Sequence, residues 1–124
     1  MPEPLYELVG GQPFFDRLVD AFYAAVATDE LLRPMYPEDF TTSKRHLALF
    51  LAQYWGGPGT YMAERGHPRL RQRHVPFHIT ALARDAWLVA MSSALASVAD
   101  ELSDEQVSQM SAYFSMAASQ LRNV

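Results

Sequence analysis

The segment HPRLRQRHVPF, residues 67–77, differs in composition from the rest of the chain. It holds two histidines, three arginines and two prolines in eleven residues, whereas the flanking sequence places apolar residues at helical spacing. Pro76 ends any helix that contains His74, because proline lacks a backbone N–H and its ring clashes with the preceding turn. We therefore expect a short helix that begins at Pro68, is capped by His67 and ends just after His74.

A single histidine is enough to hold a haem, because the porphyrin supplies four ring nitrogens and the protein adds one axial imidazole. We predict that His74 is this ligand and that the backbone carbonyl of Leu70, one helical turn earlier, accepts the second imidazole N–H. Arg71 and Arg73 are expected to contact the haem propionates, although at least one of them also fits a solvent-exposed helix face.

Other uses of the histidines are less well supported. His74 and His78 have the spacing of a zinc-binding helix, but Pro76 interrupts the helix between them, and the glutamate of a zinc-protease motif is missing. This disfavours a two-histidine zinc site. His46 lies on the flank of the next apolar stripe upstream, where we expect it to touch a propionate.

The composition limits the class of protein. The chain has 124 residues, enough for one domain over 1–124, and 49% of them are hydrophobic, which argues against disorder. The net charge of −4 disfavours a nucleic-acid-binding surface, and the absence of cysteine removes iron–sulfur and thiol chemistry. No apolar run is long enough to cross a membrane and no signal peptide is recognisable, so we expect a cytoplasmic protein.

Hydrophobic periodicity predicts an all-α chain with four substantial helices. The first carries an apolar stripe from Phe15 to Val26, and two prolines then permit only a short turn within residues 29–40. The second starts from a capping cluster at 41–43 and stops at the glycines of 56–59, and the third covers residues 80–100. The fourth begins with a capping box, Ser103 to Gln106, and no convincing strand pair is present.

Five motifs together resemble the second group of the truncated haemoglobins. They are FY (22–23), YPED (36–39), FLAQYWGGP (50–58), GHPRLRQRHVPF (66–77) and DAW (85–87). The resemblance covers nearly the whole chain, and residues 54–77 are its most specific part. It implies a truncated globin fold, in which two helix pairs form a two-over-two sandwich around a haem b (iron protoporphyrin IX), with His74 as the proximal iron ligand.

The resemblance also assigns the open, distal face of the iron. It places Tyr23, Tyr36 and Trp87 there as hydrogen-bond donors, so the usual distal histidine is absent. Taken singly, each of these three is also a normal core residue. The full set of expected haem contacts is Ser43, His46, Leu47, Phe50, Leu51, Tyr61, Leu70, Arg71, Arg73, Phe77, Trp87 and Met91, although Met91 also fits the role of core filler.

Three functions are compatible with these residues. The first is reversible, high-affinity dioxygen binding with slow release, in a protein that delivers, transports, stores or senses the gas. The second is a haem enzyme that oxidises nitric oxide or reduces peroxide at the same site. The third is a helical interaction module without a cofactor. The distal donors also favour anionic ligands, and redox turnover requires a separate reductase because no flavin or nicotinamide motif is present. The resemblance further suggests a homodimer.

Overall fold

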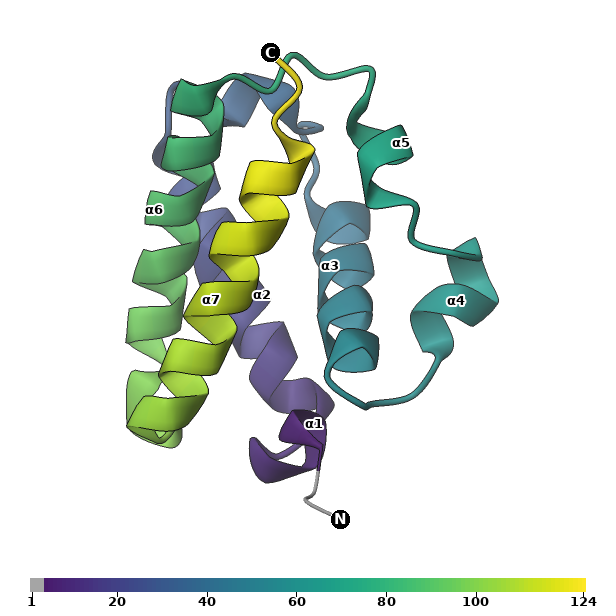
Figure 1. The fold of residues 1–124 in the computed structure, drawn as a ribbon, viewed down its shortest axis with the longest axis vertical. Coiled ribbons are helices and arrows are strands. Elements are labelled where there is room, and N and C mark those ends of the chain that lie inside the picture. Colours follow the sequence, from purple (N-terminus) through teal and green to yellow (C-terminus); the bar gives the residue numbers. More distant parts are fainter. Residues whose placement is uncertain (1–3) are drawn as a thin grey trace.

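The computed structural model describes residues 4–124, and these residues form helices joined by turns, with no strand among them (Figure 1). None of the described helices is long and apolar enough to span a bilayer. The helices are α1 (Leu5–Leu8), α2 (Gln12–Thr28), η1 (Arg33–Met35), α3 (Thr41–Tyr54), α4 (Thr60–Arg65), α5 (Leu70–His74), α6 (Ala81–Ser97), η2 (Ala99–Glu101) and α7 (Asp104–Leu121).

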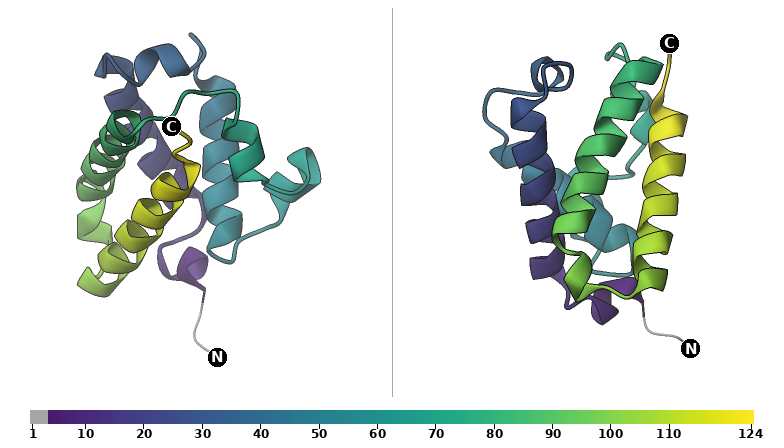
Figure 2. Two further views of the ribbon diagram at one scale, coloured as in Figure 1. Left: turned by 45° about the horizontal axis from the view of Figure 1, so that its top comes forward. Right: turned by 90° about the vertical axis from the view of Figure 1, so that its left-hand side faces the viewer.

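The four long helices form two pairs that pack against each other. Helix α2 contacts both α3 and α6, and α6 contacts α7 along its length. Figures 1 and 2 show α6 and α7 side by side. The right-hand view of Figure 2 shows α2 on the side of α6 away from α7. The apolar stripe of α2 is fully buried between these neighbours, as the sequence predicts. Its buried residues are Phe14, Phe15, Leu18, Val19, Phe22, Tyr23 and Val26.

The predicted capping box at the start of α7 is confirmed. The Ser103 hydroxyl accepts from the backbone N–H of Gln106, and the Gln106 side chain accepts from the backbone N–H of Ser103. Helix α6 begins in a similar way, because the Thr80 hydroxyl accepts from the backbone N–H of Ala83. Both helices therefore start at residues that satisfy otherwise unpaired backbone donors.

The start of α3 differs from the prediction. None of the hydroxyls at 41–43 caps the helix; instead the Asp39 carboxylate accepts from the backbone N–H of Thr41 at 2.8 Å. An aspartate readily bonds to the backbone two residues ahead, and this turn fixes the chain before the helix begins. Hydrogen bonds from the side chain and the backbone N–H of Thr41 hold the pKa of the Asp39 carboxyl below its usual range.

The predicted start of the histidine helix is also wrong, whereas its end is right. Helix α5 begins at Leu70, two residues after Pro68, because Arg69 adopts a left-handed backbone conformation with φ of 46°. His67 makes no capping hydrogen bond to α5. The helix ends at His74, two residues before Pro76, as expected. The protein thus places His74 on a helix of only five residues, which needs support from elsewhere in the fold.

Candidate haem-binding site

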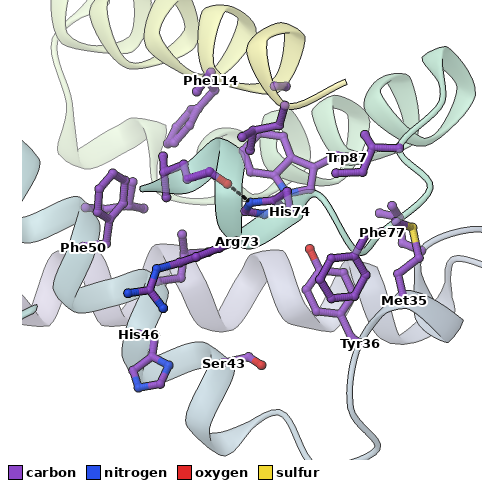
Figure 3. Close-up of a pocket in the computed structure, with 18 of the residues that line it drawn as sticks. Met35, Tyr36, Ser43, His46, Phe50, Arg73, His74, Phe77, Trp87 and Phe114 are labelled. Atoms are coloured by element: carbon purple, nitrogen blue, oxygen red, sulfur yellow. Dashed lines mark hydrogen bonds between the residues drawn. The ribbon is translucent and has the colours of Figure 1, made fainter. Parts of the chain in front are cut away.

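A cavity of about 550 Å³ opens between α3, α5, α6 and α7 (Figure 3). Its volume lies within the usual range for cofactor sites, and its walls are mainly apolar and aromatic. Thirteen of the residues predicted from the sequence line it: Tyr23, Tyr36, Ser43, His46, Leu47, Phe50, Leu51, Tyr61, Leu70, Arg73, His74, Phe77 and Trp87.

His74 is half-buried in the cavity wall, and its ring is held in one orientation. Its Nδ1–H donates to the Leu70 carbonyl oxygen at 2.6 Å, which is the hydrogen bond predicted from the sequence and the dashed line in Figure 3. This bond fixes the tautomer, because a nitrogen that donates must carry the proton. In the neutral imidazole with this tautomer, the Nε2 atom carries a lone pair and can act as a ligand to a metal.

Asn123, near the end of the chain, holds the segment that follows His74. Its side-chain Nδ2 donates to the backbone carbonyls of His74 at 3.2 Å and Phe77 at 2.9 Å. Its Oδ1 accepts from the backbone N–H of Ile79 at 2.9 Å, and its own N–H donates to the Ile79 carbonyl at 3.0 Å. We refer to these four hydrogen bonds as the Asn123 clasp. No sequence pattern predicted this clasp, since a single asparagine after a helix is common.

Arg73 supports the other end of α5 and is less available to an anionic group than the sequence suggested. Its Nε donates to the Pro68 carbonyl at 2.7 Å, and one terminal nitrogen donates to the Arg65 carbonyl at 3.0 Å. These bonds tie the loop before α5 to the helix. Arg71 is exposed and does not line the cavity, whereas Arg65 and Arg84, which were not predicted as contacts, do.

The tyrosines and Trp87 line the cavity as a connected aromatic group. The rings of Tyr23 and Tyr36 meet edge to face with centroids 5.5 Å apart, and the Trp87 ring packs against Phe22 at 5.3 Å. Burial raises the pKa of Tyr36 to about 12, and a hydrogen bond with Trp87 opposes part of this rise. Because an indole N–H only donates, the Tyr36 hydroxyl is the acceptor in that pair, and its own proton is free for a ligand.

Tyr23 is the more deeply buried of the two tyrosines, with 4% of its surface exposed. Burial raises the pKa of its hydroxyl well above the usual value, and the neighbouring Tyr36 adds to the rise, while a hydrogen bond with Ser43 opposes it. Both tyrosines are therefore neutral donors at every physiological pH.

His46 extends from α3 into the cavity and differs from His74 in its electrostatic surroundings. Burial and then the positive charge of Arg65 lower its pKa, with smaller contributions from Arg45 and Arg73, while Glu64 opposes them. His46 is therefore mostly uncharged at neutral pH. Figure 3 shows His46 in the lower part of the view, below Arg73 and His74.

One wall of the cavity was not predicted from the sequence, and two of the predicted haem contacts, Arg71 and Met91, do not line the cavity. Met91 does not line the cavity but is buried in the core, with 1% of its surface exposed. The periodicity of α7 identified its apolar face, but not that this face borders a cavity, because a stripe that packs on protein and one that packs on a ligand look the same. The lining residues of α7 are Tyr113, Phe114, Ala117, Ala118 and Leu121.

The fold consists of two helix pairs that enclose an aromatic cavity, and one oriented imidazole lies in the cavity wall. This combination defines a small haem protein of the globin class. The chain belongs to the bacterial-like globin family, whose model matches residues 4–120. Membership in this family implies that the protein binds haem and dioxygen.

Individual relatives place the chain in the second group of truncated haemoglobins. It is 48% identical to the group 2 truncated haemoglobin YjbI of Bacillus subtilis over 90 residues, which is 73% of this chain and 67% of the relative. The crystal structure of the haemoglobin of Chloroflexus aurantiacus superposes with a TM-score of 0.95 at 46% identity, covering 99% of this chain and 100% of that one. The group II truncated haemoglobin of Bacillus anthracis gives a TM-score of 0.94 at 35% identity, over 100% and 94% of the two chains.

These comparisons confirm the predicted family and the two-over-two fold.

Proposed function

We propose that the cavity holds a haem b, with His74 Nε2 as the protein ligand to its iron. The observation that carries this proposal is the hydrogen bond from His74 Nδ1–H to the Leu70 carbonyl, which leaves Nε2 with a free lone pair in the cavity wall. The aromatic lining suits the porphyrin faces, and Arg65, Arg84 and His46 supply polar groups for the propionates. When bound, the haem supplies an iron that binds dioxygen in its ferrous state.

The distal residues support tight dioxygen binding with slow release. The hydroxyls of Tyr23 and Tyr36 offer two donors in the cavity, and the Trp87 N–H offers a third when it turns from Tyr36 to the ligand. A buried donor to a partly negative ligand contributes roughly 1–3 kcal/mol. One solved relative, from Bacillus subtilis, is described as an oxygen-avid truncated haemoglobin and is 40% identical to this chain. We infer the same property here.

Haem titration of the purified apoprotein tests the proposal. We expect the wild-type protein to bind one haem per chain with a sharp Soret band. His74→Ala removes the imidazole and should weaken haem retention by at least tenfold, whereas His78→Ala, an exposed histidine four residues away, should leave it unchanged. Equal haem affinity and equal Soret spectra for wild type and His74→Ala would show that His74 is not the ligand.

Turnover at the same site is the second candidate function. The donors that hold dioxygen are also placed to polarise a bound peroxide or to retain dioxygen for reaction with nitric oxide. Consumption of nitric oxide by the oxygenated protein, or peroxide-dependent oxidation of a phenol, separates turnover from storage. Sustained activity with an added reductant would assign an enzyme, and a single stoichiometric reaction would assign a binding protein.

Some expectations from the sequence stay predictions. These are a role in oxygen transport, a cytoplasmic location, a single domain over residues 1–124, a homodimer and a separate reductase. Analytical ultracentrifugation of the haem-loaded protein tests the homodimer.

A further inference from the structure

Positive charge is concentrated in the segment that carries His74. Residues 65–78 include four arginines and three histidines and no acidic residue, while the whole chain has ten basic and fourteen acidic side chains. Helix α5 and the end of α4 lie at one edge of the molecule in Figure 1, where α5 also contacts α7. This edge is therefore the positive part of an acidic protein.

The arginines on this edge are not neutralised within the described part of the chain. Arg65, Arg69 and Arg71 are exposed, and none of them lies in an ion pair with a carboxylate of residues 4–124. By contrast, Arg45 pairs with Glu64 at 2.5 Å and Arg84 with Asp85 at 3.1 Å. Arg69 and Arg71 stay available to an anionic partner even when Arg65 contacts a haem propionate, and they attract it over roughly a Debye length of 8–10 Å.

Exposed apolar side chains lie next to these arginines. Val75 is 69% exposed and Phe77 is 43% exposed, directly after α5. Apolar groups beside arginines are typical of transient protein interfaces, in which the charges guide the approach and the apolar contacts hold the complex. We call this surface the α5 edge; it consists of Arg65, His67, Arg69, Arg71, Val75 and Phe77.

The α5 edge is close to the proposed iron ligand. Arg71 precedes His74 by three residues on the same helix, a separation of about 4.5 Å along the axis. Phe77 belongs to both places, because it is partly exposed and also lines the cavity. The Arg73 hydrogen bonds to the Pro68 and Arg65 carbonyls hold the loop in one shape before any partner arrives.

We propose that the α5 edge is the docking surface for an acidic electron-carrier protein. This inference rests on the proposed haem site, because reaction of bound dioxygen leaves ferric iron that must be reduced before dioxygen binds again. In the proposed step the reduced carrier loses one electron, and the iron(III) gains it and becomes iron(II). No bond to the protein forms or breaks, and no proton is transferred.

Charge and position favour a protein carrier over other polyanions. A nucleic acid or an anionic membrane extends well beyond a segment of fourteen residues, and it would meet the carboxylates that dominate the rest of this acidic chain. A small acidic carrier covers the edge without such contacts and brings its redox centre toward His74.

Anaerobic stopped-flow reduction of the ferric holoprotein tests this surface. The probe is a reduced flavodoxin, a small acidic flavoprotein that donates single electrons. Arg71→Glu should lower the second-order rate about tenfold at low ionic strength, and the difference should fall as salt is added. Arg17→Glu, which makes the same charge change on α2 and also removes the ion pair with Glu101, is the control and should stay within about twofold. Both variants should react alike with the small reductant dithionite.

Nuclear magnetic resonance gives a readout that does not depend on electron transfer. On titration of the isotope-labelled, carbon monoxide-bound holoprotein with oxidised flavodoxin, the shifted amide signals should map to residues 65–78. The proposal is overturned if Arg71→Glu and Arg17→Glu react alike with flavodoxin, if the shifts map elsewhere, or if DNA or anionic vesicles shift these signals and flavodoxin does not. A protein that fails to bind haem at all would instead refute the proposed function.

Discussion

His74 owes its chemical role to a neighbour that is fixed by backbone geometry. The carbonyl of Leu70 lies one turn before it on α5 and receives the Nδ1 proton at 2.6 Å. A histidine at the same position without this acceptor would rotate and exchange tautomers. Across the cavity, a hydrogen bond with Trp87 opposes part of the rise that burial causes in the pKa of Tyr36.

Trp87→Phe tests the contribution of the indole N–H, because it removes this donor and keeps most of the bulk of the ring. Phenylalanine retains most of the aromatic contact with Phe22 but has no N–H. We expect the dioxygen dissociation rate, measured by stopped-flow displacement with carbon monoxide, to rise roughly tenfold or more, since one donor contributes about 1–3 kcal/mol. Leu88→Ala, on the same helix but outside the cavity lining, is the control. An unchanged rate in Trp87→Phe would mean that the indole does not reach the ligand.

The raised pKa values of the two tyrosines predict how the dioxygen dissociation rate and the free energy of unfolding depend on pH. The pKa of Tyr36 is raised to about 12 and that of Tyr23 is raised further, so the dioxygen dissociation rate should be constant between pH 7 and 9. In the unfolded chain a tyrosine loses its proton near pH 10. Between about pH 10 and 12 the unfolded state therefore binds fewer protons than the folded state, and the free energy of unfolding should fall as the pH rises. A dissociation rate that titrates near pH 8 would contradict the assignment.

At the scale of the element, α5 is too short to be stable alone. It has five residues, no side-chain cap and a left-handed residue before it, so its position depends on Arg73 on one side and the Asn123 clasp on the other. The end of α7 and the helix that carries His74 are therefore mechanically linked. We expect changes near Asn123 to alter the position of His74, the proposed iron ligand.

Asn123→Asp tests this link with little change of shape. The aspartate retains an acceptor for the Ile79 N–H but loses both donors to the carbonyls of His74 and Phe77. We expect haem transfer to an excess of apomyoglobin to become several-fold faster, because about 1 kcal/mol is lost for each such bond. Arg122→Ala, whose parent side chain bonds within residues 4–124 only to the Val124 carbonyl, should show the wild-type rate. Equal rates for both variants would exclude a role for the clasp in haem retention.

At the scale of the whole molecule, long helices and their order were predictable because apolar periodicity and capping residues are local signals. The stripe of α2 and the capping box of α7 were read correctly from a few residues each. The start of α5 was not predictable in the same way, since the left-handed Arg69 and the Arg73 hydrogen bonds depend on packing. The α7 wall of the cavity and the clasp from Asn123 arise from contacts between distant parts of the chain, which periodicity does not encode.

Resonance Raman spectroscopy of the deoxygenated ferrous protein tests the central assignment most directly. The wild-type protein should show an iron–histidine stretching band. His74→Gly should lose that band, and added imidazole should restore one at a frequency that shifts with isotopic labelling of the imidazole. A band that persists in His74→Gly without imidazole would show that another residue holds the iron, and would contradict the account.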